Sequence, residues 1–181
     1  MQKLFVISGS SGVGKGTVIK RFLDAHKDFK LSISCTTRQK REGEIDGVNY
    51  FFLSEEEFSN CVKNNEFLEW AEFSGNHYGT KKEFVEKCLK NGENLILEID
   101  TKGALNVKSI MEDAVLIFIA PPSFEELEAR LRGRHTETEE SIQKRLAAIK
   151  LEKDNSKNFD HIVINDTVEN AVRQLERIIF N

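Results

Sequence analysis

Short apolar runs recur along the chain and predict buried strands. Residues 4–8, 95–99 and 115–120 are rich in Val, Ile and Leu, and residues 161–164 form a fourth candidate. The runs are continuous rather than alternating, which is typical of strands that are covered on both faces. We therefore expect an α/β core, with a mostly parallel sheet between two layers of helices.

Helices are predicted between these strands. The first, over residues 17–26, follows a glycine-rich turn. A Ser, Thr or Asp that precedes a Glu by three positions predicts three later helix starts: Ser123 with Glu126, Thr136 with Glu139, and Asp166 with Glu169. We expect the second of these helices to run towards Lys153 and the third to end near Phe180.

The segment 34–92 has a different pattern. Residues 48–53 and 67–73 alternate between apolar and polar positions, which predicts short, partly exposed strands. Ser54 with Glu57 predicts a capped helix between them. Four glycines predict turns: Gly43, Gly47, Gly75 and Gly79.

Three parts are therefore predicted. An α/β core comprises residues 1–33, 93–122 and 158–181, and a small α+β insert comprises residues 34–92. The charged, helical stretch 123–157 is predicted to be a lid.

Composition and charge narrow the class of protein. The 181 residues include 26 Lys+Arg and 30 Asp+Glu, a net charge of −4, which does not favour binding to a nucleic acid polymer. No apolar run approaches the roughly 20 residues of a membrane span, and no signal-peptide pattern opens the sequence. Three scattered cysteines favour a reducing compartment. We expect a cytoplasmic protein that does not bind membranes.

The sequence GSSGVGKGT, from Gly9 to Thr17, has the spacing of a phosphate-binding loop. Glycines allow several backbone N–H groups to face phosphate oxygens, and a lysine adds positive charge for the outer phosphates. The candidate ATP-binding residues are Gly9, Ser10, Ser11, Gly12, Val13, Gly14, Lys15, Gly16 and Thr17. Gly16 stands where Ser or Thr usually follows the lysine, so Thr17 is only a candidate Mg²⁺ ligand. The Gly-Thr ending favours phosphoryl transfer over a GTP-hydrolysing switch.

Two acidic residues, Glu98 and Asp100, lie at the end of the apolar run that begins at residue 95. We expect Asp100 to be the last residue of this strand, where its carboxylate could hold Mg²⁺ through water. A cap for the following helix is the alternative role of Asp100.

Several motifs in a fixed order make the chain resemble the guanylate kinases, a family of P-loop nucleoside-monophosphate kinases. Besides the phosphate loop they are residues 34–44 (SCTTRQKREGE), 46–52 (DGVNYFF), 66–71 (EFLEWA), 75–80 (GNHYGT), 120–123 (APPS), 133–140 (GRHTETEE) and 164–166 (IND). The resemblance implies transfer of a phosphoryl group from ATP to GMP or dGMP, with Mg²⁺ as cofactor. It leaves open whether the protein is a monomer or a homo-oligomer.

The resemblance also implies residue roles. Four residues would hold the phosphate of GMP: Arg38, Arg41, Tyr50 and Tyr78. Four would read guanine: Ser34, Glu69, Thr80 and Glu98. A carboxylate at position 69 can accept from the ring N–H and the exocyclic amine of guanine, whereas adenine lacks both donors there.

Further roles implied by the resemblance concern ATP. Arg130, Arg134 and Arg145 would surround its phosphates, and Asn165 would contact its adenine. The predicted catalytic residues are Lys15, Arg38, Arg134 and Arg145. Two alternatives are a kinase of another monophosphate such as AMP, and a catalytically inactive module of the same fold that binds phosphorylated peptides. The Glu69 chemistry disfavours the first, and the intact loop and arginines disfavour the second.

Overall fold

The computed structural model describes residues 3–10, 12–73, 75–123, 125, 127–128, 132 and 139–181. Five parallel strands form the larger of its two sheets: β2 (Phe29–Leu31), β7 (Asn94–Glu98), β1 (Leu4–Gly9), β8 (Val115–Ala120) and β9 (His161–Ile164), in that spatial order. The four predicted buried strands are all present. Strand β2 was not predicted, because three residues are too few to establish a periodicity.

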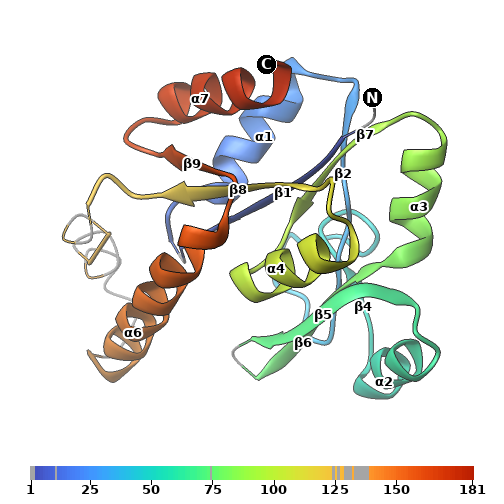
Figure 1. The fold of residues 1–181 in the computed structure, drawn as a ribbon. Helices are drawn as coiled ribbons and strands as arrows, with labels where there is room; N and C mark the ends of the chain where they lie inside the picture. Colours follow the sequence, from blue (N-terminus) through green and yellow to red (C-terminus); the bar gives the residue numbers. More distant parts are fainter. Residues whose placement is uncertain are drawn as a thin grey trace.

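Helices cover both faces of this sheet (Figure 1). Helices α1 (Lys15–Ala25) and α7 (Val168–Phe180) pack on one face, and α3 (Lys82–Lys90) and α4 (Thr101–Ile110) pack on the other. Successive residues of β1 point to opposite faces of the sheet. Phe5 therefore packs in the core beneath α1 and α7, and Val6 packs in the core beneath α3 and α4. Burial of each such side chain contributes roughly 1.5–3 kcal/mol to folding.

A smaller sheet lies beside α4, in the order β4 (Phe51–Phe52), β3 (Cys35–Thr36), β6 (Asn76–Lys81) and β5 (Phe67–Phe73). Helix α2 (Glu55–Lys63) begins at the capping box formed by Ser54 and Glu57, as predicted. The prediction of a strand over residues 48–53 is wrong apart from β4. A turn occupies the preceding residues, where the N–H of Gly47 donates to the carbonyl of Tyr50 at 2.8 Å.

One glycine prediction is also wrong. Gly43, Gly47 and Gly75 adopt the left-handed conformation of turns, but Gly79 lies inside strand β6. A Cβ atom at Gly79 would lie 2.9 Å from the ring of Phe67. The sequence has glycine there because an aromatic ring packs against the strand, and not because the chain turns.

Helix ends differ from the prediction by one or two residues. Helix α1 begins at Lys15, because the left-handed Gly14 is its N-cap. The N-cap of α7 is Thr167 rather than Asp166, and the Thr167 side chain accepts from the N–H of Asn170 at 3.2 Å. Two further helices in the described ranges precede β9: α6 (Glu139–Asn155) and the short 3₁₀ helix η1 (Ser156–Asn158). Glu126 and Thr136, which belong to the predicted helix starts, lie outside the described residues. None of the helices in the described ranges combines the length and apolar character needed to cross a membrane.

Candidate active site

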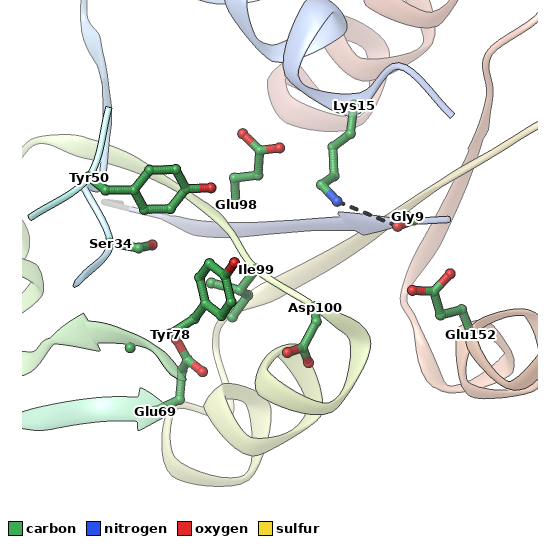
Figure 2. A pocket seen from close by; sticks show the side chains of 11 residues that line it. Gly9, Lys15, Ser34, Tyr50, Glu69, Tyr78, Glu98, Ile99, Asp100 and Glu152 are labelled. Atoms are coloured by element: carbon green, nitrogen blue, oxygen red, sulfur yellow. Dashed lines mark hydrogen bonds between the residues drawn. The ribbon is translucent and has the colours of Figure 1, made fainter. Parts of the chain in front are cut away.

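A cavity of about 230 Å³ lies between the carboxyl edge of the parallel sheet and the smaller sheet (Figure 2). Eight residues singled out in the sequence line it: Gly9, Lys15, Ser34, Tyr50, Glu69, Tyr78, Glu98 and Asp100. They come together because β1 and β7 are parallel neighbours whose carboxyl ends share one edge, while β5 and β6 face that edge. Ligands of open α/β sheets bind at such edges.

The glycine-rich loop joins β1 to α1 at this edge. Gly9 allows close approach of β1 and β8, since a Cβ atom there would lie 2.4 Å from the carbonyl oxygen of Ile119. Among the described residues, no side chain caps α1, so the N-terminal N–H groups of this helix can face an anion. The ammonium of Lys15 lies inside the cavity and donates to the carbonyl of Gly9 at 3.4 Å.

The side chain of Asn165 packs against this loop and forms a hydrogen bond with its backbone. Its side chain is 5% exposed, and its amide donates to the carbonyl of Val13 at 2.7 Å. The same amide nitrogen would lie 2.9 Å from a Cβ atom at Gly14. The family resemblance implied a contact between Asn165 and adenine, which stays a prediction, whereas the contact seen in the structure is with the phosphate loop.

Glu69 is a buried carboxyl group in the wall of the cavity. Its side chain extends from β5 and accepts a hydrogen bond at 2.7 Å from the hydroxyl of Thr80, on the neighbouring strand β6. Burial raises the pKa of Glu69 to about 7; the Thr80 hydroxyl opposes this shift, and the nearby Asp100 carboxylate adds to it. Thr80 is itself fully buried, behind Glu69.

Tyr50, Tyr78 and Arg38 form a cluster of hydrogen-bond donors, and the two tyrosines line the cavity. The two tyrosine rings meet edge to face, with centroids 6.1 Å apart, and the Arg38 guanidinium lies 5.4 Å from the centroid of the Tyr50 ring. Burial raises the pKa of the Tyr50 hydroxyl, and the Glu98 carboxylate reinforces this effect, so the group remains a hydrogen-bond donor at neutral pH.

Glu44, which was not among the predicted site residues, forms hydrogen bonds with Arg38 and with the backbone of Arg41. Its carboxylate accepts from the Arg38 guanidinium at 2.7 Å and from the backbone N–H of Arg41 at 2.8 Å. The hydrogen bond from Arg38 lowers the pKa of Glu44, and the same bond raises the pKa of Arg38. A carboxylate six residues after an arginine is too common a pattern to have indicated this pairing.

Asp100 is not the last residue of a strand, because β7 ends at Glu98. It is instead the N-cap of α4, where its carboxylate accepts from the N–H of Gly103 at 2.8 Å. The alternative role as a helix cap is therefore observed. The capping oxygen is one of two, so a further role at the cavity stays a prediction.

The cavity also has three lining residues that were not among the predicted site residues: Gly79, Ile99 and Glu152. Glu152 extends from α6, across the cavity from the smaller sheet (Figure 2). A glutamate in a charged helical stretch carries no signal of its position in the fold. Among the remaining predicted residues, Ser11, Arg130 and Arg134 lie outside the described residues; Arg145 belongs to α6, but its side chain is not described.

Comparison of the sequence with known protein families identifies relatives of this chain. The family model described as guanylate kinase matches residues 1–181. The chain belongs to the guanylate kinase family. It is 51% identical over 176 residues to a guanylate kinase of Caldanaerobacter subterraneus subsp. tengcongensis, covering 97% of this chain and 85% of that relative. It is 49% identical to one from Prochlorococcus marinus strain NATL2A, covering 96% and 93% of the two chains.

A solved structure agrees with this assignment. The crystal structure of guanylate kinase from Anaplasma phagocytophilum superposes with a TM-score of 0.82 at 30% identity, covering 99% of this chain and 85% of that chain. The predicted family, α/β fold class and enzyme class are confirmed. Guanylate kinases bind ATP and GMP as substrates, and ATP-dependent phosphorylation of GMP, the predicted activity, is the activity of this family.

Proposed function

We propose that the chain transfers the γ-phosphoryl group of ATP to GMP or dGMP in the cavity between the two sheets. One observation carries the proposal: the lysine of a phosphate loop and a buried carboxyl group suited to guanine line the same cavity. In this proposal residues 34–92 are the GMP-binding insert and residues 123–157 are the lid. The three free thiols support a reducing cytoplasm as the place of reaction.

Guanine is selected by hydrogen bonds with a buried carboxylate. Glu69 accepts from the ring N–H and the exocyclic amine of guanine, and Thr80 holds the carboxylate from behind. Ser34 donates to the guanine carbonyl oxygen, and Glu98 lines the same cavity. Adenine would leave this buried carboxylate without a donor, and the cost of an unpaired buried charge supports strong discrimination.

The phosphate of GMP is held by donors on the insert. The hydroxyls of Tyr50 and Tyr78 face the cavity (Figure 2). Arg38 and Arg41 supply positive charge in this proposal. Two nitrogens of the Arg38 guanidinium already donate, to Gln39 and Glu44, which fixes the plane of the group. A fixed guanidinium is pre-organised for two phosphate oxygens.

Phosphoryl transfer then needs alignment and positive charge more than covalent chemistry. The loop N–H groups and Lys15 hold the outer phosphates of ATP, and the family resemblance assigns further positive charge around these phosphates to Arg130, Arg134 and Arg145. A phosphate oxygen of GMP is already anionic, so no protein base is required. Closure of the lid and insert excludes water, which limits wasteful hydrolysis of ATP.

The charge around the cavity supports Mg²⁺ as cofactor. Four carboxyl side chains and one ammonium line its described part: Glu69, Glu98, Asp100, Glu152 and Lys15. Two polyanionic nucleotides need more positive charge than this wall supplies. The described residues contain no cluster of three metal-ligating side chains, so the donor set fits an ion held mainly by phosphates and water, with Asp100 and Thr17 as the proposed protein ligands. Bound Mg²⁺ would supply charge neutralisation on the phosphates.

A coupled assay for ADP tests the proposed function. ATP is offered with GMP, dGMP, AMP, CMP or UMP in turn, with and without Mg²⁺. We expect ADP formation with GMP and dGMP only, and only with Mg²⁺. ADP release without an acceptor, or comparable rates with AMP, would contradict the proposal.

Asp100→Asn separates the capping role of this residue from a role toward Mg²⁺. Asn caps a helix as well as Asp does, so we expect the free energy of unfolding to change by less than about 0.5 kcal/mol. Loss of the charge should raise the Mg²⁺ concentration for half-maximal activity roughly tenfold. Asp100→Ala is the matched comparison and should also cost about 1 kcal/mol of stability. Identical Mg²⁺ titrations of all three proteins would limit Asp100 to the cap.

A further inference from the structure

The first turn of helix α4 lies directly against the carboxyl group of Glu69. An ideal Cβ atom built on Gly103 would lie 2.6 Å from Oε2 of Glu69 and 3.3 Å from its Cδ. The other oxygen, Oε1, accepts from Thr80 at 2.7 Å. The carboxyl group is therefore enclosed between a hydroxyl of β6 on one side and the backbone of α4 on the other.

Gly103 has no backbone reason to be glycine. It is the third residue of a regular helix, and it does not adopt the left-handed conformation that favours glycine. Alanine has a higher helix propensity at such a position. The absence of a side chain therefore makes room, and what occupies that room is the end of Glu69.

We infer that Gly103 is a positioning residue for guanine selection, because its missing side chain lets the Glu69 carboxylate lie against α4, at the wall of the cavity. This inference rests on the proposed role of Glu69. The Glu69 carboxylate belongs to the motif at residues 66–71, but the position of this carboxylate is set by α4, a helix that packs on the parallel sheet.

Alanine at position 103 would displace the carboxylate rather than the helix. The closest atom is the far end of a side chain with rotatable bonds, so rotation of Glu69 relieves the contact most easily. Rotation breaks the Thr80 hydrogen bond and misaligns both acceptors toward guanine. The expected loss is thus in GMP recognition, while the helix itself is favoured.

The test compares Gly103→Ala in two backgrounds. In the otherwise unchanged protein we expect the KM for GMP to rise about 10- to 100-fold, since a displacement of about 1 Å at a positioned group has effects of this size. The KM for ATP and the melting temperature should be nearly unchanged. In the Glu69→Asp background, whose carboxylate is one methylene shorter, Gly103→Ala should change the KM for GMP less than about twofold.

A binding measurement complements the kinetics. Trp70 is the only tryptophan and follows Glu69 in β5, so its emission can follow GMP titrations without turnover. Lys102→Ala, an exposed change in the same helical turn, is the control and should match the unchanged protein. Equal GMP affinity of Gly103→Ala and the unchanged protein, or the same loss in both backgrounds, would overturn the inference. If the unchanged protein did not distinguish GMP from AMP, the proposed function itself would fail.

Discussion

Replacement of Lys15 by alanine is expected to lower turnover of ATP and GMP roughly 10²- to 10³-fold, because one donor aimed at developing charge contributes about 3–4 kcal/mol to a transition state. Its ammonium is the one cationic side chain in the described lining of the cavity, so no neighbour there can replace it. The fold should persist, because Lys15 makes one long hydrogen bond of 3.4 Å to Gly9. Steady-state assays and thermal unfolding of both proteins measure the two effects.

Lys20→Ala is the matched control for Lys15→Ala. Lys20 lies on the same helix but is exposed to solvent. It should keep near-normal turnover, which separates the loss of one particular ammonium from a general loss of charge on α1. Near-normal turnover of Lys15→Ala would remove the role assigned to this lysine.

Glu69→Gln should lower kcat/KM for GMP about 100-fold or more while leaving the KM for ATP nearly unchanged. The glutamine keeps one acceptor but turns an amide donor toward the donors of guanine, and a site that leaves buried polar groups unpaired rejects its ligand strongly. Glu72→Gln, an exposed change on the same strand, is the control. Equal losses toward both nucleotides would contradict base reading by Glu69.

The pH dependence of the same pair provides a second measurement. Because burial raises the pKa of Glu69 to about 7, kcat/KM for GMP should rise with pH through this region. The Gln variant should lack that rise, and since GMP is common to both proteins, titration of its phosphate cancels in the comparison. The folded protein also holds this proton more tightly than the unfolded chain, so the stability that Glu69 contributes below pH 4.5 is lost as the pH rises through about 7. At pH 8 the Glu69→Gln protein should therefore be more stable than the unchanged protein by on the order of 2 kcal/mol, whereas at pH 4 it should have no such advantage.

Local patterns predicted the elements that depend on neighbours in the chain. The continuous apolar runs of β1, β7, β8 and β9 and the capping box at Ser54 could be identified directly. Errors arose where two signals are alike in sequence. In the sequence, a glycine at position 79 looks the same whether it turns the chain or makes room for the ring of Phe67. Likewise, Asp100 looks the same whether it ends a strand or caps the following helix.

The sequence by itself determined the family, the α/β class and the set of chemical groups, because motifs such as the phosphate loop carry their chemistry within a few adjacent residues. Only the tertiary structure decided how these groups are held. Asn165 supports the loop at Val13, Glu44 orders Arg38, and Glu152 reaches the cavity from α6. Gly103 leaves space for Glu69 across 34 positions of sequence. Such contacts form between elements that fold from distant parts of the chain, and the pattern of one segment contains no information on which other segment will pack against it.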